Sequence, residues 1–555
     1  MSTDQPLSTH ESLSTNESLS TPVLPAQPDS FHVYDTTLRD GAQQEGLRLS
    51  VADKIRIATL LDELGVNFIE GGWPGANPND TEFFAAAARG DLLLKHATLA
   101  AFGSTRRAGG RAADDPLVAA TRDSAAQVAC LVAKSHDGHV ERALRTTLDE
   151  NLAMISDTVS HLRSEGMRVF IDCEHFFDGY RRNPAYSREV LRTIAEAGAE
   201  LAVLCDTNGG MLPQWITEIV GEVAELGLPL GIHCHNDTGC AVANSMAAVD
   251  AGAMHVQGTI NGYGERTGNA DLGTVVANLE LKYGWSVLPH PDSLTELTRI
   301  SHAITAVTNV AGSPRQPYVG SSAFAHKAGL HASAIKVDPN LYQHIDPALV
   351  GNDMRMLISD MAGRASIQIK GEQLGFDLSD RDLAARITGV VKEREARGYS
   401  YEAADASFEL LLRDTLDQLD KPFSVINWRV LTNAGRNGDA DTEATVKLEA
   451  KGDVQAFVGE GNGPVDALDH ALRRALEPAF PAVMHYDLTD YRVRIIDSGH
   501  GTDASVRVLI DTRDGEHTWT TVGVGTNVIE ASWEALSDAY LYGLVTVRDR
   551  EATSV

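Results

Sequence analysis

Cysteine is scarce in this chain and basic residues are outnumbered, and each shortage excludes a class of protein. The 555 residues include five cysteines, none in a Cys-x-x-Cys pair, which excludes a disulfide framework. With 47 Lys and Arg against 77 Asp and Glu, the formal charge is −30. That balance argues against nucleic acid or a membrane surface as partners. Because no apolar run reaches the roughly eighteen residues of a membrane span, we expect a multidomain protein of the cytoplasm.

The first thirty residues lack lysine and arginine altogether. They repeat a Leu-Ser-Thr unit and continue into a proline-containing stretch, without the apolar core of a secretory signal. The missing basic residues count against an organelle transit peptide. We therefore predict a disordered tail over residues 1–30.

From residue 31 onward, short apolar runs alternate with segments of helical periodicity, and each run ends in a polar or glycine-rich cluster. Between the first two runs, Ser50 suits a helix N-cap and Gly65 the position after the helix end. Eight strand-like runs alternating with helices predict a (β/α)₈ TIM barrel over residues 31–300, with its chemistry at the C-terminal strand ends. The runs are 32–40, 67–74, 97–104, 127–135, 168–178, 201–210, 229–237 and 255–269.

Two further regions follow the predicted barrel. Residues 301–421 have mostly helical patterns and indicate a linker or lid subdomain. Residues 422–555 are rich in strand patterns and contain a weak internal repeat, in which a strand, a Val-Gly-x-Gly turn and a helix follow one another twice. The repeated turns predict a pseudo-duplicated C-terminal α+β domain. Their glycines are Gly459, Gly461, Gly523 and Gly525.

The most informative local pattern is a pair of histidines, His233 and His235, at the end of the seventh run. Residues i and i+2 of a strand share a face, so both imidazoles point into the barrel mouth. Hydrogen-bonded polar residues are the plain alternative. Asp40 and Asn269, at the ends of the first and eighth runs, would complete a mixed nitrogen and oxygen set that favours an open divalent metal site over a closed structural zinc.

Other polar residues at strand ends have both a chemical and a structural interpretation. Arg39 directly precedes Asp40 and would place a permanent cation beside the metal, although Arg-Asp-Gly is commonly a surface turn. Glu174 could act as an acid or base or hold a neighbour in place. Thr207 could bind a carboxylate or form an ordinary turn. The glycine-rich stretch 262–269 lacks the lysine of a P-loop, which excludes that phosphate site.

The motifs taken together resemble a known superfamily. DTTLRDGAQ, HCHND and GYGERTGNADL resemble the DRE-TIM metallolyases, which make or break carbon–carbon bonds through metal-stabilised enolates. YVGSSAFAHKAGLHASAI and the C-terminal repeat narrow the resemblance to the branch of 2-isopropylmalate, homocitrate and citramalate synthases. Within this branch EGGWPGANPND, EHFFDGY and YQHIDPALVGN are most similar to the citramalate synthases, and the resemblance covers about residues 31–550.

The resemblance implies an acyltransferase that condenses acetyl-CoA with pyruvate and water to (R)-citramalate, in isoleucine biosynthesis by way of 2-oxobutanoate. It implies Mg²⁺ or Mn²⁺ as the metal, with Co²⁺ or Zn²⁺ as alternatives. The alternatives in activity are a 2-isopropylmalate synthase using 2-oxoisovalerate, a homocitrate synthase, or a lyase of the same superfamily. The residues carried over are the metal ligands Asp40, His233, His235 and Asn269, the catalytic residues Arg39, Glu174, His331 and Tyr342, and the substrate-binding residues Arg39, Gln43 and Thr207.

The resemblance also assigns a regulatory role to the C-terminal domain. Such domains bind a branched-chain amino acid as a feedback inhibitor, which for this chain would be isoleucine. The turns at Gly459, Gly461, Gly523 and Gly525 lead into helix N-termini, which can receive a carboxylate. We also expect the domain to support a homodimer.

Overall fold

The computed structural model describes residues 25–358, 363–434, 440–496, 504–515 and 517–553, so most of the predicted tail lies outside the described residues. The chain divides into two compact units. The first unit comprises Met1–Ala323 and Pro347–Asn352, and the second Phe324–Asp346 and Asp353–Val555. The last residues of the predicted tail pack within the first unit, where Gln27 Nε2 donates a hydrogen bond to Ser286 O at 3.0 Å.

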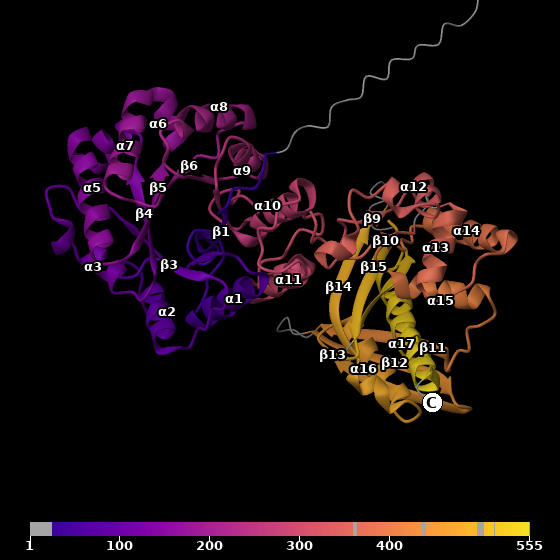
Figure 1. Cartoon of the computed structure of the whole chain (residues 1–555). Helices are drawn as coiled ribbons and strands as arrows, with labels where there is room; N and C mark the ends of the chain where they lie inside the picture. The colour runs from indigo at the N-terminus through magenta and orange to yellow at the C-terminus, as the bar shows by residue number, and fades with distance from the viewer. Residues whose placement is uncertain (1–24, 359–362, 435–439, 497–503, 516, 554–555) are drawn as a thin grey trace, which may run out of the picture. The chain divides into compact units, whose positions relative to one another are not determined.

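The first unit contains a closed barrel of eight parallel strands (Figure 1). The strands follow one another around the ring in chain order, and the last pairs with the first, where His32 lies opposite His255. The predicted TIM barrel is therefore confirmed. Its strands are β1 His32–Asp35, β2 Phe68–Glu70, β3 Thr98–Ser104, β4 Val128–Lys134, β5 Arg168–Glu174, β6 Leu201–Asp206, β7 Leu230–Cys234 and β8 His255–Gly258.

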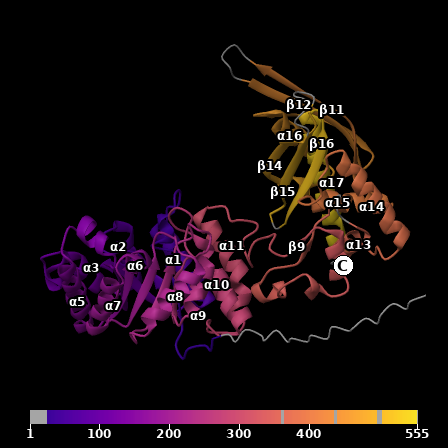
Figure 2. The ribbon, with the colours of Figure 1, turned by 90° about the horizontal axis from the view of Figure 1, so that it is seen from above.

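Helices connect the consecutive strands and surround the barrel (Figure 1 and Figure 2). The main ones are α1 Val51–Leu64, α2 Pro78–Arg89, α3 Pro116–Arg122, α5 Leu148–Ser164, α6 Phe176–Arg182, α7 Pro184–Glu196, α8 Pro213–Ala224, α9 Ala241–Asp250, α10 Leu272–Asn278 and α11 Leu297–Thr308, with a single turn, α4, at Asp137–His139. Among the described residues, no helix combines the length and the apolar character that crossing a membrane requires.

Helix α1 begins and ends at the residues predicted from the sequence. The Ser50 hydroxyl accepts a hydrogen bond from Asp53 N at 3.2 Å, and the Asp53 carboxylate accepts one from Ser50 N at 2.8 Å. This reciprocal capping box satisfies amides at the helix start. Gly65 has a φ of 95°, a left-handed conformation that ends the helix and that glycine adopts at little cost.

Helix α11 crosses the predicted barrel boundary at residue 300. Its apolar side is buried at Leu297, Ile300 and Ile304, and it packs against α1. The helical layer of the first unit therefore continues beyond the eighth strand.

The second unit begins with a small helical part. Two short strands, β9 Ala325–His326 and β10 Arg355–Met356, pair in parallel. Residues such as Ile367, Ile387, Phe408 and Leu412 bury their side chains in one cluster with Val522. The helices are α12 Gly329–Ile335, α13 Arg364–Gln373, α14 Arg381–Ala396 and α15 Asp405–Thr415.

The rest of the second unit is a duplicated pattern of three antiparallel strands and a helix, as predicted. The first copy is β11 Phe423–Ala434, β12 Ala440–Ala450, β13 Asp453–Gly461 and α16 Pro464–Leu476. The second is β14 Asp487–Ile495, β15 Val506–Arg513, β16 Thr518–Gly525 and α17 Val528–Thr553. Each sheet has its strands in chain order and packs its own helix, and both copies contribute to one apolar core.

Candidate functional site

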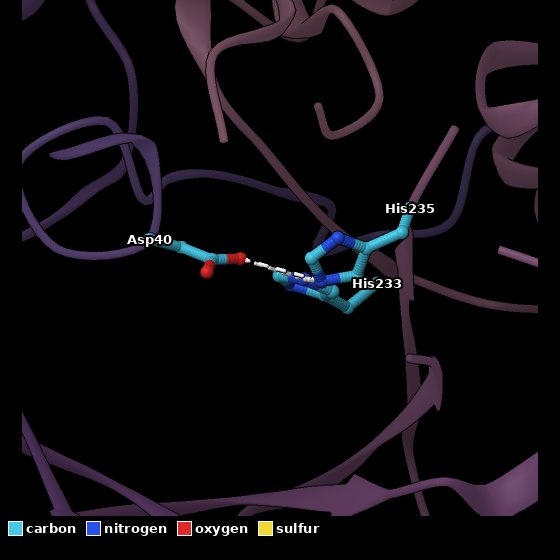
Figure 3. A group of neighbouring side chains, drawn as sticks. All are labelled: Asp40, His233 and His235. Carbon is cyan, nitrogen blue, oxygen red and sulfur yellow. Dashed lines mark hydrogen bonds and ion pairs between the residues drawn. The ribbon is translucent and has the colours of Figure 1, made fainter. Parts of the chain in front are cut away.

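Asp40, His233 and His235 converge at the C-terminal ends of β1 and β7 (Figure 3). Asp40 Oδ2 lies 3.2 Å from His233 Nε2 and 3.6 Å from His235 Nε2. The two Nε2 atoms are 3.4 Å apart. The side chains are buried, and the period of two along the strand end brings both imidazoles to the same face.

Asn269 is held beside this group. Its backbone forms a bridge with His235, and its Nδ2 donates to Tyr263 O at 3.0 Å. Its buried Oδ1 has no hydrogen-bond partner among the described residues, and neither has His235 Nδ1. An acceptor oxygen without a donor is costly to bury. A carboxylate, two imidazoles and an orphaned amide oxygen thus fit a divalent metal ion.

Arg39 places a fixed positive charge next to Asp40. Its Nε donates to Glu70 Oε2 at 2.6 Å, and its Nη1 lies 3.4 Å from Asp40 Oδ1. The guanidinium lies 3.9 Å from the centre of the Phe102 ring. Two partners and an aromatic face therefore hold the guanidinium in one place.

The charges of the site favour an ionised Asp40. Burial alone would raise the pKa of this carboxyl, but Arg39 and the two histidines outweigh burial and hold the pKa well below its usual range. Burial and the neighbouring His233 lower the pKa of His235 to about 4, so that this imidazole is neutral near pH 7. An ionised carboxylate and a neutral imidazole are the forms that bind metals.

A cavity of about 250 Å³ opens beside the three residues. Thr207 Oγ1 accepts a hydrogen bond from His175 N at 2.8 Å, and Glu174 forms an ion pair with Lys134. Charged and polar residues therefore line a space large enough for a small molecule. The cavity brings together the predicted residues Arg39, Asp40, Gln43, Glu174, Thr207, His233 and His235, with Trp73, Phe102, Val132, Asp172, Cys205, Glu265 and Arg266.

His331 and Tyr342 belong to the second unit. Their rings stack with centroids 4.1 Å apart, and His326 lies 6.1 Å from His331. Tyr342 is 40% exposed. The structure thus places these two predicted residues in direct contact with each other, and both belong to the second unit.

The four glycines of the repeated turns lie at the ends of β13 and β16. A Cβ on Gly459 would lie 2.3 Å from Ala471 N, and one on Gly523 would lie 2.0 Å from Ala531 O. Close packing of strand on helix therefore accounts for these two glycines. Gly461 is equally confined by Ala467 N, at 2.5 Å, whereas Gly525 has no neighbour closer than 3.5 Å.

Two of the site's buried residues were not singled out by the sequence analysis. Glu70, at the end of β2, accepts from Arg39 and from the Tyr34 hydroxyl at 2.9 Å. Gln257, within β8, lies 2.9 Å from His233 Nδ1. A polar residue in an otherwise apolar strand was the available signal. The sequence does not show which distant residues such a side chain contacts.

Family models match three consecutive parts of the chain. The HMGL-like model matches residues 30–304, and the homocitrate synthase post-HMGL domain-like model matches residues 318–398. The model of the LeuA allosteric (dimerisation) domain matches residues 402–544. The barrel with its cluster of Asp40, His233 and His235 and the duplicated C-terminal fold thus define an HMGL-like enzyme that has an allosteric dimerisation domain.

Relatives similar over nearly the whole chain narrow this class. An (R)-citramalate synthase of Streptomyces coelicolor is 65% identical over 520 residues, which cover 93% of this chain and 97% of the relative. An (R)-citramalate synthase of Synechocystis is 48% identical over 529 residues, which cover 93% of this chain and 96% of the relative. A probable 2-isopropylmalate synthase of Methanopyrus kandleri is 33% identical over 509 residues, covering 92% and 97%. This chain belongs to the family of (R)-citramalate synthases.

Proposed function

We propose that the protein condenses acetyl-CoA with pyruvate and water to give (R)-citramalate and free CoA, as an entry to isoleucine by way of 2-oxobutanoate. The observation that carries this proposal is the 65% identity with an (R)-citramalate synthase over 520 residues. The buried cluster of Asp40, His233 and His235 beside a small polar cavity supports it.

We infer that Asp40, His233, His235 and Asn269 hold a divalent ion, with Mg²⁺ or Mn²⁺ expected before Co²⁺ or Zn²⁺. Such an ion, when bound, polarises the keto oxygen of pyruvate as a Lewis acid. The short distances among the three ionisable side chains and the orphaned Asn269 Oδ1 support this ligand set. Mixed nitrogen and oxygen donors with open positions suit a catalytic site.

Arg39 stabilises the negative charge that develops on oxygen as the new carbon–carbon bond forms. Its guanidinium is already aligned by Glu70 and Phe102, so little reorganisation accompanies the reaction. One preorganised donor of this kind lowers a barrier by about 3 kcal/mol.

Thr207, Gln43 and Glu174 complete the binding of the 2-oxo acid. The Thr207 hydroxyl binds the pyruvate carboxylate, and Gln43 contributes at the mouth of the cavity. Glu174 manages protons, and its ion pair with Lys134 holds the carboxylate in place. The position of all three in one cavity of about 250 Å³ supports these roles.

His331 takes a methyl proton from acetyl-CoA, and the resulting enolate carbon attacks the keto carbon of pyruvate. Tyr342, stacked on the His331 ring at 4.1 Å between centroids, positions that imidazole. Water then hydrolyses the citramalyl thioester and releases CoA.

Isoleucine inhibits the enzyme by binding to the C-terminal domain, which we place at residues 422–555, and this domain supports a homodimer. The LeuA allosteric (dimerisation) model over residues 402–544 supports both statements. The amino acid's carboxylate binds near the turns of Gly459, Gly461, Gly523 and Gly525. This chain's own carboxylates already accept from Asn462 N and Val524 N, so the effector would use the remaining amides.

Release of free thiol from acetyl-CoA tests the proposal. The purified protein with Mg²⁺ or Mn²⁺ receives pyruvate, 2-oxobutanoate, 2-oxoisovalerate or 2-oxoglutarate separately. We expect the highest kcat/KM with pyruvate. A clear preference for 2-oxoisovalerate or 2-oxoglutarate would assign 2-isopropylmalate or homocitrate synthesis instead, and no thiol release with any of them would refute the condensation.

A further inference from the structure

A row of buried hydrogen bonds runs from β5 through β8 to the metal-binding cluster on β7. Gln257 Nε2 donates to Asp172 Oδ1 at 3.0 Å. At its other end, Gln257 Oε1 lies 2.9 Å from His233 Nδ1. None of the three side chains belongs to the same strand as another, and all three are buried.

The chemistry of Asp172 sets the direction of every hydrogen bond in this row. Asp172 Oδ1 accepts from both Gln257 Nε2 and the Cys130 thiol, so the amide NH₂ of Gln257 faces Asp172. The carbonyl oxygen of Gln257 then faces His233, and an oxygen requires a donor at Nδ1. His233 Nδ1 therefore carries the proton, and Nε2 keeps its lone pair on the side of Asp40.

Cys130 is a further partner of this arrangement: its thiol donates to Asp172 Oδ1 at 3.2 Å, and its sulfur accepts from Gln257 Nε2 at 3.7 Å, so neither contact involves the carbonyl oxygen that faces His233. Gln257 is 0% exposed and Asp172 is 4% exposed, so bulk water does not substitute for either contact. The second histidine differs, because His235 Nδ1 is buried with no partner among the described residues. The row of hydrogen bonds therefore orients the imidazole of His233 and does not reach that of His235.

We propose that Gln257 and Asp172 are positioning residues that hold His233 in the tautomer and ring orientation required to bind the divalent metal. This inference rests on the proposed function, in which His233 is a metal ligand. Partners of this kind typically change metal affinity by about 10- to 100-fold.

The test is the affinity of the full-length protein for Mn²⁺, measured by equilibrium dialysis with electron paramagnetic resonance of the free ion and without substrate. Gln257→Leu removes the acceptor at His233 Nδ1, and we expect the Kd to rise by about 10- to 100-fold. Cys173→Ala is the matched control. Its buried thiol donates to Ile171 O at 3.9 Å and lies on the opposite face of β5 from Asp172, so we expect the Kd to change less than about twofold.

A double variant, Asp172→Asn with Gln257→Glu, separates positioning from packing. The introduced asparagine amide can donate to the introduced glutamate, whose second oxygen still accepts from His233 Nδ1. The acceptor at His233 Nδ1 and the total charge of the row are therefore kept, while the hydrogen bond between residues 172 and 257 is reversed. We expect Mn²⁺ affinity within about threefold of the wild type or tighter. This variant also decides the matter if Gln257→Leu does not fold.

The outcomes distinguish a failure of the positioning role from a failure of the proposed metal site. Wild-type affinity in Gln257→Leu, an equal loss in Cys173→Ala, or a double variant as weak as Gln257→Leu would each overturn the positioning role. If the wild type itself binds no Mn²⁺, or His233→Ala binds it equally well, the proposed metal site fails instead.

Discussion

Individual side chains of this barrel act in pairs rather than alone. Arg39 is held by Glu70 at 2.6 Å, and His233 is bracketed by Asp40 at 3.2 Å and Gln257 at 2.9 Å. Each reactive group thus has a partner that limits its orientation. Substitutions at this scale should therefore change chemistry more than stability, provided that no buried charge is left unpaired.

The first prediction concerns His233. His233→Ala removes a proposed metal ligand, so we expect metal binding and thiol release to be lost together, with kcat/KM at least about 100-fold lower. Cys234→Ala is the control, because this buried residue lies between the two histidines and points to the opposite face. Metal retained at full occupancy in His233→Ala would refute the ligand assignment.

The second prediction concerns the acid stability of the barrel through His255. This side chain is 0% exposed, and neither ring nitrogen has a partner among the described residues. Burial, together with His32, His233 and Arg168, lowers the pKa of His255 well below its usual value. The unfolded chain therefore binds a proton below about pH 6.5 that the folded barrel does not.

The sign follows from this difference in protons bound. The stability that a neutral His255 contributes is present above about pH 6.5 and is lost as the pH falls, by about 1.4 kcal/mol per pH unit. His255→Leu should therefore show a smaller decrease in unfolding temperature between pH 7.5 and pH 5.0 than the wild type. Equal decreases in the two proteins would contradict this assignment.

At the scale of elements, strand ends and strand–helix contacts account for both candidate sites. The parallel barrel brings residues from β1, β5, β6 and β7 to one cavity although they are far apart in the chain. In the second unit, β13 and β16 approach their helices so closely that Gly459 and Gly523 have no room for a side chain. Gly459 and Gly523 of the repeated turns therefore allow each strand to pack closely against its helix.

The third prediction tests that packing. A Cβ on Gly523 would lie 2.0 Å from Ala531 O, whereas one on Gly525 would have no neighbour closer than 3.5 Å. We expect Gly523→Ala to lower the stability of the second unit by about 1–3 kcal/mol and Gly525→Ala to change it little. Thermal unfolding of both variants, with the isoleucine response recorded beside it, makes the comparison. Equal unfolding temperatures would refute the packing role.

At the scale of the whole molecule, the helical part of the second unit shares its core with the sheets. Val522 of β16 lies in the same apolar cluster as Phe408 and Leu412, and Val522 N donates to the Ser407 hydroxyl at 3.0 Å. The regulatory fold thus covers apolar surface that the preceding helices cannot bury alone.

The fourth prediction follows from this shared core. A chain that ends at Lys421 should lose its response to isoleucine, and it should also unfold at a lower temperature because the cluster around Phe408 is exposed. Thiol release with and without isoleucine, followed by a thermal scan, provides the measurement. Inhibition that survives the truncation would refute the assignment of the regulatory domain.

The sequence alone predicted the barrel, the ends of α1 and the duplicated C-terminal pattern. These depend on local rules: apolar periodicity, a serine before a helix, a glycine after it and a repeated turn. It also indicated Asp40, His233, His235 and Asn269, because chemically distinctive residues followed predicted strands.

The tertiary structure decided which residues meet. Glu70 and Gln257 could not be recognised beforehand, because their partners lie elsewhere in the barrel, Arg39 after β1, Asp172 on β5 and His233 on β7, and only barrel closure brings them within hydrogen-bond distance. The same holds for Val522, which completes a core begun by helices more than a hundred residues earlier. Local pattern determines the elements, whereas the contacts that orient a reactive group are long-range and follow from closure and packing.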